Sequence, residues 1–338
     1  ERHGRREQPP RAGLADCADN TLKLDYVRIS YDGVRYTAPL PIPAAADTLL
    51  RRRTNGDVYL KYSFTVRDLP ESLAAEIEPM HVQAVWLNGK AIAADGEGTL
   101  EKSFLRADIR NDVRVGENEL VCRIEYRQPD TVYEVLFDRA DVTESLINCL
   151  TYDTEIDAAY LRGQFGVCSL GGYADVRPGI ALSDGPFVLT ALPREMESAR
   201  LNRQGFPFFA GRMTLRFSVE LENPDCSLRL YGRYATAQVR VNGVEFPPLL
   251  FEDEVDVHRA LRPGSNELCI TLCCSNRNLL GPSHVKDDPE PLMVFPDHFD
   301  LGKDWQDGKN PRYTDSYSFV DFGLDEWEWV PLVQDSFC

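Results

Sequence analysis

The sequence predicts an all-β fold made of two β-sandwich domains in tandem. Three observations support this prediction: short stretches in which apolar and polar residues alternate, turn residues between those stretches, and a turn pattern that occurs twice. Alternation with a period of two buries one face of a strand, and many short strands with frequent turns are typical of sandwiches or barrels. Helical periodicity is scarce, and only the short segments 70–75 and 142–149 are helical candidates.

The clearest strands lie at corresponding places in the two halves of the chain. Residues 58–66 and 213–221 both alternate and are rich in β-branched and aromatic side chains. Asn88-Gly89 and Asn242-Gly243 each lie between apolar stretches. Because both residues of an Asn-Gly pair tolerate positive φ, this dipeptide predicts a tight hairpin turn at each place.

An internal repeat connects these features. In each half an alternating strand is followed by a strand that ends in Asn-Gly, and then by a Gly-x-Asn-Glu-Leu turn at residues 116–120 or 264–268. The spacing agrees, because 24 residues separate Phe64 from Asn88 and 25 separate Phe217 from Asn242. Two such units predict two similar domains.

The predicted boundaries follow from the repeat and from the turn residues around residues 149–175. Residues 1–19 are expected to form a flexible N-terminal arm, and residues 20–150 the first sandwich. Residues 151–175 are expected to connect it to the second sandwich, residues 176–338, whose last strand is predicted at residues 317–322.

The paired turn motifs resemble those of the jelly-roll sugar-binding domains of glycoside hydrolase family 2 and the galactose-binding-like superfamily. The residues that match are Val85, Leu87, Asn88, Gly89, Gly116, Asn118 and Leu120 in the first copy, and Val239, Val241, Asn242, Gly243, Gly264, Asn266 and Leu268 in the second.

Two further segments, 153–166 and 275–284, look like parts of large bacterial family-2-like or α-L-rhamnosidase-like glycoside hydrolases. The resemblance implies two tandem jelly-roll sandwiches from the C-terminal region of such an enzyme. In those proteins a catalytic barrel precedes such β-modules. A (β/α)8 barrel needs about 250 residues, so two β-domains leave no room for one in this chain.

The charge of the chain limits the classes of binding partner that can be expected. The formal net charge is −17, and the basic runs are short. Because phosphate backbones and anionic membranes need a basic surface, we expect neither nucleic acid nor membrane as a partner, and a neutral ligand fits better. No stretch reaches the ~18 apolar residues of a membrane span, which predicts a soluble protein.

The nine cysteines show no even framework and no Cys-x-x-Cys pair, so buried reduced thiols are expected. This favours a cytoplasmic location. Residues 1–11 lack the apolar core of a signal peptide. A secreted protein stays an alternative if the N-terminus is the cut edge of a longer chain.

A search for catalytic motifs finds none that supports catalysis by this chain. There is no Gly-x-Ser-x-Gly, no His-Glu-x-x-His and no glycine-rich phosphate loop, and the five histidines lack metal-ligand spacing. A glycosidase needs two carboxylates that face each other across the sugar. Glu155 with Asp157, and Glu195 with Glu197, alternate on predicted strands, but solvated strand faces explain both pairs. No catalytic residue is predicted.

The candidate ligand-binding residues lie in two polar loops. Residues 275–284 follow a predicted strand and carry amide, guanidinium and imidazole groups, which could form directional hydrogen bonds to sugar hydroxyls. Trp305 lies in the polar segment 300–313, where its ring could stack on a sugar. The alternative is that these side chains fix their own loops or contact a neighbouring domain. The predicted sugar-binding residues are Asn276, Arg277, Asn278, His284 and Trp305.

The other three tryptophans are interpreted as structural. Trp86 lies within an apolar strand and is expected to pack in a core. Trp327 and Trp329 share one strand face, which favours packing on a domain or a partner. The acidic clusters at residues 252–254 and 287–288 could hold structural calcium, although neither shows a recognisable loop pattern. No other cofactor is predicted.

The sequence therefore predicts an accessory, non-catalytic carbohydrate-binding or structural module of a bacterial glycoside hydrolase. Its expected partners are carbohydrate and a catalytic domain absent from this chain. Two alternatives stay open. One is a protein-interaction pair of sandwiches without sugar affinity, and the other is a glycosidase with its site at the interdomain cleft.

Overall fold

A computed structural model describes residues 5–295, 297–300, 305–306 and 308–332. The all-β prediction is confirmed for these residues, because four strands reach 11 residues whereas the longest helix, α1 (Ile42–Arg51), has 10. No helix among them is long and apolar enough to cross a membrane. The strands gather into two units, each with its own apolar core.

The first unit consists of two sheets that enclose one core. One sheet has the order β10-β11-β7-β13-β3, and the other has the order β14-β17-β6-β12-β8-β9, with β4 paired to β6 and β5 to β4. The strands are β3 (Asn20–Leu24), β4 (Tyr26–Ser30), β5 (Leu40–Pro41), β6 (Gly56–Val66), β7 (Ala74–Ile77), β8 (Val82–Leu87), β9 (Lys90–Ile92), β10 (Gly96–Glu97), β11 (Leu105–Asp108), β12 (Gly116–Tyr126), β13 (Ala159–Gly163), β14 (Gly166–Ser169) and β17 (Phe187–Thr190).

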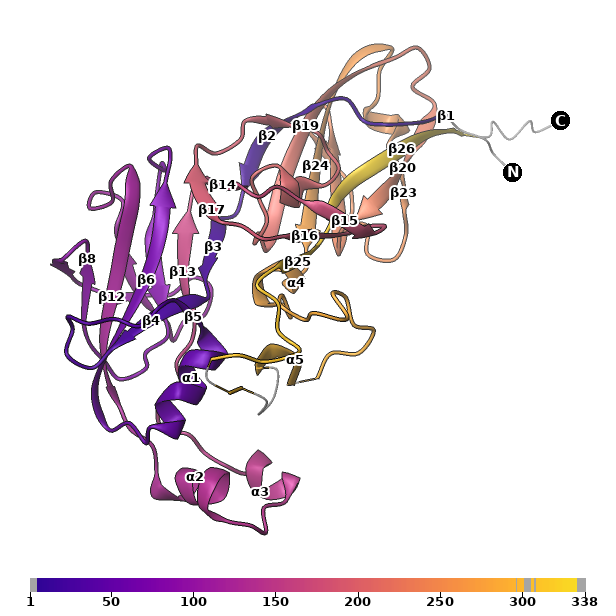
Figure 1. Cartoon of the computed structure of the whole chain (residues 1–338). Coiled ribbons are helices and arrows are strands. Elements are labelled where there is room, and N and C mark those ends of the chain that lie inside the picture. Colours follow the sequence, from indigo (N-terminus) through magenta and orange to yellow (C-terminus); the bar gives the residue numbers. More distant parts are fainter. Residues whose placement is uncertain (1–4, 296, 301–304, 307, 333–338) are drawn as a thin grey trace.

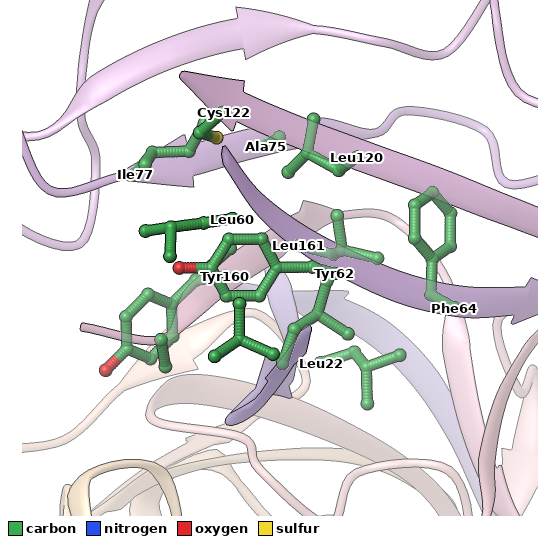
Figure 2. Packing of buried hydrophobic residues seen from close by; sticks show 14 of the residues in the cluster. Leu22, Leu60, Tyr62, Phe64, Ala75, Ile77, Leu120, Cys122, Tyr160 and Leu161 are labelled. Atoms are coloured by element: carbon green, nitrogen blue, oxygen red, sulfur yellow. The ribbon is translucent and has the colours of Figure 1, made fainter. Parts of the chain in front are cut away.

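Side chains from both sheets meet in this first core (Figure 2). Leu60 and Tyr62 of β6 and Leu120 of β12 face Leu22 of β3 and Leu161 of β13. The predicted alternation explains this arrangement, since every second residue of β6 from Val58 to Val66 is buried.

The second unit also has two sheets around one core, but its strands come from both ends of the chain. The sheet orders are β18-β2-β19-β24-β21-β22 and β1-β26-β20-β23. The strands are β1 (Arg5–Glu7), β2 (Ala12–Cys17), β18 (Glu195–Met196), β19 (Gly211–Leu221), β20 (Cys226–Arg233), β21 (Thr236–Val241), β22 (Val244–Glu245), β23 (Glu254–Asp256), β24 (Gly264–Cys274) and β26 (Gly323–Pro331).

The expected flexible arm is therefore wrong for residues 5–7 and 12–17. The first of these segments pairs with β26 and the second with β19, and Ala12 is fully buried in the second core. In Figure 1 the indigo strand β2 lies beside β19, among strands from the second half of the chain. The first unit is thus inserted into the second, between β2 and β18.

The predicted connecting segment, 151–175, differs from the structure in the same way. Strand β13 is buried at every residue and pairs with β3 and β7, so residues 159–163 belong to the first unit. Strand β14 then pairs with β17, which runs parallel to β6. The predicted boundary at residue 150 therefore falls before the last strand of the first unit.

The remaining elements lie between or beside the two units. A three-stranded sheet contains β15 (Ala174–Arg177), β16 (Ile180–Ser183) and β25 (Tyr317–Val320). The short helical segments are α2 (Asp130–Tyr133), η1 (Glu134–Asp138), α3 (Glu144–Asn148), η2 (Leu201–Arg203), η3 (His258–Ala260), α4 (Arg277–Leu280) and α5 (Asp297–Asp300).

The helix predicted at 142–149 is confirmed by α3, whose N-cap Thr143 accepts a hydrogen bond from the Leu146 N–H. The helix predicted at 70–75 is wrong, because residues 74–77 form β7 within a sheet. The strand predicted at 317–322 is β25, but the chain continues into β26. Trp327 and Trp329 on β26 are buried in the second core, as predicted.

Both repeated turns are built by the same hydrogen bonds. Asn88 and Asn242 adopt φ of 51° and 49°, as a tight Asn-Gly hairpin turn requires. Asn88 Nδ2 donates to Asn118 Oδ1 at 2.8 Å, and Asn242 Nδ2 donates to Asn266 Oδ1 at 2.8 Å. We call each pair an asparagine bracket, because it joins the hairpin turn to the Gly-x-Asn-Glu-Leu turn.

The inner asparagine of each bracket also closes its own turn. Asn118 exchanges hydrogen bonds with the backbone of Arg114, and Asn266 does the same with Arg262. Asn118 is 0% exposed and Asn266 1%, so neither can contact a ligand. The motif that carries the family resemblance therefore has a structural role here.

The cysteines agree with the expectation of reduced thiols. All eight cysteines that the structure describes are free, and Cys122, Cys226, Cys269 and Cys274 are buried. Burial raises the pKa of Cys122 and of Cys274 to about 12, so both stay protonated and unreactive at neutral pH.

Candidate functional site

The segment between β24 and β25 contains all five residues predicted to bind sugar, and its described residues (275–295, 297–300, 305–306 and 308–316) are called the strap. It leaves the second unit at β24 and reaches the first, where Leu279 enters the first core. In Figure 1 the described residues of the strap are drawn in orange to gold, with α4 below the second unit and α5 near α1.

Asn276, Arg277 and Asn278 organise the start of the strap. The Asn278 side chain is buried and exchanges two 2.8 Å hydrogen bonds with the backbone of Val320, so it substitutes for a strand at the edge of β25. Arg277 pairs with Glu290 at 2.9 Å. Asn276 is exposed and is the N-cap residue of α4. The backbone and ion-pair partners of Arg277 and Asn278 match the structural alternative for these residues.

Trp305 is 2% exposed and packs with Ala44 of α1 and Val285. A ring covered on this scale offers no face for a sugar, so the prediction of sugar stacking by Trp305 is wrong for this structure. The indole instead attaches the strap to α1, and Arg51 Nη2 donates to the Trp305 carbonyl at 3.0 Å.

His284 differs from the other predicted residues because it lines a cavity. Its Nδ1 lies 2.9 Å from the carbonyl oxygen of Thr314, and its Nε2 lies 3.3 Å from Oδ2 of Asp25. Each ring nitrogen of His284 therefore faces an oxygen that can accept a hydrogen bond. Asp25 lies between β3 and β4 of the first unit, and this ion pair therefore joins the strap to that unit.

Three tyrosines surround the Asp25–His284 pair. The ring centroids of Tyr317, Tyr313 and Tyr26 lie 4.3, 4.9 and 6.2 Å from that of His284. The Tyr317 hydroxyl donates to Asp25 Oδ1 at 2.6 Å, and the Tyr26 and Tyr313 hydroxyls are 2.7 Å apart. The three phenol rings and the imidazole thus pack as one aromatic cluster beside Asp25.

The cavity beside this cluster has a volume of about 430 Å³, within the range of small-molecule sites. It lies between the first unit and the strap. Its polar lining combines Lys23 and Asp25 at the end of β3, Asp157 and Tyr160 at the start of β13, and His284 and Tyr313 of the strap. We call it the strap cavity.

The two carboxylates of the strap cavity are shifted in opposite directions. Burial alone would raise the pKa of Asp25, but hydrogen bonds from His284 and Tyr317 and the charges of His284 and Lys23 lower it below its ordinary value. Burial raises the pKa of Asp157, and the hydrogen bond from the Ala158 N–H and the charge of Lys23 offset only part of that rise. Asp25 is therefore held ionised, while Asp157 is more readily protonated.

A second hollow has a volume of about 650 Å³. Lys23 and Asp25 line both spaces, and the larger one is bordered by Arg28, Asp184 and Asp315. The strap cavity is the stronger candidate, because it contains the shifted carboxylates together with His284. Arg277 and Asn278 line neither space but border a separate hollow of about 260 Å³.

Acidic side chains of the two clusters considered for calcium contact other side chains of the protein. Glu254 accepts hydrogen bonds from Ser227 and Arg229, and Asp288 lies 3.9 Å from Arg177. Among the residues that the structure describes, no group of three or more His, Cys, Asp or Glu side chains could hold a metal ion.

Sequence reasoning missed Asp25, Lys23 and the tyrosines of this site. The sequence pairs Asp157 with Glu155 on one predicted strand face, but the carboxylate that shares the cavity with Asp157 is Asp25, and Glu155 is exposed. Trp86 was also misplaced: it is half-buried and lies beside Tyr59, outside the core.

Comparison with known proteins yields no matching protein-family model and no matching curated protein. Among solved structures, the chain is similar to a β-D-mannosidase from Dictyoglomus thermophilum (15% identity, TM-score 0.29) over 76% of this chain and 31% of the enzyme.

Two further similar structures were found. A GH2 β-galacturonidase from Eisenbergiella tayi bound to glycerol has 12% identity and a TM-score of 0.28, with coverage of 76% and 37%. A β-glucuronidase from Ruminococcus gnavus has 14% identity and a TM-score of 0.31, with coverage of 78% and 40%. The chain thus spans well under half the length of each of these enzymes.

Proposed function

We propose that this chain is an accessory module of a glycoside hydrolase that binds a neutral sugar in the strap cavity without cleaving it. The observation that supports this best is the strap cavity itself, where Lys23, Asp157, His284 and Tyr160 surround a space of about 430 Å³. Sugar hydroxyls both donate and accept hydrogen bonds, so a lining of cation, carboxyl and phenol groups can satisfy them.

Binding is favoured over catalysis by the way Asp25 is held. One of its oxygens accepts from Tyr317 of β25 and the other faces His284 of the strap, so both oxygens are already engaged. A carboxylate that attacks a sugar or activates water needs an oxygen free to approach the anomeric carbon. Asp25 therefore acts as a positioning residue that forms one wall of the cavity.

The test is a calorimetric titration of the chain with a panel of neutral mono- and oligosaccharides. We expect binding by at least one sugar, with millimolar to micromolar Kd. Lys23→Met, which removes a hydrogen-bond donor from the cavity, should weaken that binding at least tenfold. Lys102→Met alters an exposed lysine away from the cavity and should leave Kd unchanged. Failure of every sugar to bind, or equal effects of the two variants, contradicts the proposal.

A glycosidase is the second candidate, because Asp25 and Asp157 line one cavity with pKa values shifted apart. A protonated acid beside an ionised carboxylate is the arrangement used in glycoside hydrolysis. Hydrolysis of chromogenic glycosides by this chain, abolished by Asp157→Asn, would favour the enzyme over the binding module. Absence of turnover together with measurable sugar binding would favour the module.

The proposed partner is a catalytic domain of the same hydrolase. Its contact surface would be the apolar part of the strap, where Leu292, Met293, Val294 and Phe295 are all exposed. Exposed apolar groups on this scale mark interaction surfaces. A partner domain should lose affinity on Leu292→Ser with Phe295→Ser, but not on Val34→Ser, which changes an exposed valine in another loop.

A further inference from the structure

The outer face of the first unit carries aromatic side chains where a solvated sheet usually carries polar ones. On β6, Val58 and Leu60 are buried and Tyr59 between them is half-buried. On β8, Val85 and Leu87 are buried and Trp86 between them is half-buried. Because neighbours along a strand point to opposite faces, Tyr59 and Trp86 lie on the face away from the core.

The two rings form a platform. Their planes lie within 29° of each other, and their centroids are 6.3 Å apart. Since carbon atoms in face-to-face contact are about 3.5–4 Å apart, the two rings are offset sideways and do not lie directly over one another. Lys61, two residues along β6 from Tyr59 and so on the same face, lies with its ammonium 4.2 Å from the ring centroid of Tyr36.

The second unit provides an internal control for these aromatic positions. Strands β6 and β12 pair in the same register as β19 and β24, so Tyr59 corresponds to Thr214. Strand β8 pairs with β12 as β21 pairs with β24, so Trp86 corresponds to Arg240. The neighbouring ion pair is repeated, as Lys61 with Glu119 and as Arg216 with Glu267. The scaffold therefore folds without aromatic residues at these two positions.

The charges around the platform indicate a neutral ligand. Lys61 pairs with Glu119 at 3.1 Å, and Arg123 lies 3.9 Å from Asp57, so cations and anions alternate across the face. The chain as a whole carries a charge of −17, which disfavours polyanions. Flat rings flanked by paired hydrogen-bonding groups fit a polyhydroxylated ligand that has apolar C–H faces.

We propose that Tyr59 and Trp86 form a second carbohydrate-binding site, which stacks on the sugar rings of a neutral oligosaccharide chain. This site is separate from the strap cavity and does not rest on the function proposed for it. Binding at both places would let one module hold a longer glycan by avidity.

The experiment uses the fluorescence of the full chain, because Trp86 is the accessible tryptophan. Trp305, Trp327 and Trp329 are 2%, 1% and 7% exposed, so acrylamide quenches mainly Trp86. We expect neutral oligosaccharides of four to six units, such as cellohexaose, xylohexaose and mannohexaose, to protect Trp86 from quenching. Tyr59→Ala should raise Kd at least tenfold, whereas Trp86→Phe, followed by calorimetry, should retain binding.

The matched controls are Thr214→Ala and Lys23→Met, which change the corresponding face of the second unit and the strap cavity. Both should leave protection of Trp86 unchanged, so failure of the cavity proposal would not affect this result. The inference is overturned if no oligosaccharide protects Trp86, or if Tyr59→Ala leaves Kd unchanged while the variant keeps the wild-type Tm. It is also overturned if Trp86 is covered by self-association that Trp86→Ala abolishes.

Discussion

The two units share one strand plan but differ in what joins their second and third strands. In the first unit, β4 is followed by a connection of residues 31–55, which contains α1, before β6. In the second unit, the connection between β2 and β19 is residues 18–210, and it contains the whole first unit. Cys17 and Met213 are direct partners in the ladder, so the ends of this insertion lie side by side.

This difference shows how a repeat can be nested without changing either core. Domain insertion is tolerated where the two ends of a loop are close together, because the host strands keep their pairing. The first unit is continuous in sequence, whereas the second needs β1 and β2 from residues 5–17. The two units should therefore respond differently to cutting the chain.

The largest expected effect is on folding of the separated halves. A fragment of residues 19–192 keeps every strand of the first unit and should unfold cooperatively on heating. Residues 193–338 alone lack β1 and β2 and should show no cooperative transition. Fusing residues 1–18 to residue 193 through a short linker keeps β18 and the whole second core and should restore folding, as measured by circular dichroism and the fluorescence of buried Trp327. Independent folding of residues 193–338 would break the nested description.

The next effect concerns the ion pair that joins the first unit to the strap. Asp25→Asn removes the carboxylate that accepts from Tyr317 and lies beside His284 in a nearly buried site, and losing hydrogen bonds to a buried charged acceptor costs about 3 kcal/mol. The pKa of Asp25 is lowered by folding, so its stabilisation is present above the unfolded pKa of about 3.9 and is lost as pH falls below it.

Chemical denaturation between pH 7 and pH 3 measures this effect. The wild type should lose stability steeply below pH 4, and Asp25→Asn should reduce that slope. Glu267→Gln, which alters an exposed ion pair of the second unit, should cost far less. Equal losses of stability for Asp25→Asn and Glu267→Gln would show that the Asp25–His284 contact does not connect the strap to the first unit.

The asparagine brackets test whether the two units are equivalent. Asn118→Ala and Asn266→Ala each leave buried backbone groups without partners, which should cost about 2–3 kcal/mol in either unit. Asn111→Ala changes an exposed asparagine of the first unit and serves as the control. Urea unfolding measures the stability of all three variants. A large difference in stability between Asn118→Ala and Asn266→Ala would show that the brackets are not equivalent.

Turn chemistry explains how much of this fold is visible in the sequence. The Asn-Gly dipeptides predicted both hairpins, because their geometry is determined by adjacent residues. The spacing in the sequence matches Phe64 with Phe217. In the structure, Phe64 pairs with Asn118 across the ladder and Val219 pairs with Asn266, so the true equivalent of Phe64 is Val219. A shift by two residues preserves the buried face, so alternation alone could not detect it.

The insertion of one unit into the other and the strap cavity could not be predicted from the sequence, because both depend on contacts between residues far apart in the chain. Strand β2, Ala-Gly-Leu-Ala-Asp-Cys, contains neither β-branched nor aromatic residues, so nothing local marks it as a partner of β19. Asp25 and His284 are far apart in sequence and meet only because the strap returns to the first unit. The sequence therefore predicted His284 as a polar loop residue without its carboxylate partner.

The smallest effect concerns Asp157, the other carboxylate of the strap cavity. Burial raises its pKa, so folding favours the protonated form, and this contribution is present below the unfolded pKa and lost as pH rises through the folded pKa. Asp157→Asn keeps an oxygen that can accept from the Ala158 N–H at the same place but removes the buried charge. We expect Tm at pH 7 to rise by a few degrees, with little change at pH 3.

The matched variant Glu155→Asn alters an exposed neighbour and should leave both values unchanged. If Asp157→Asn instead lowers Tm at pH 7, the ionised carboxylate stabilises the cavity, and Asp157 then resembles Asp25 in role.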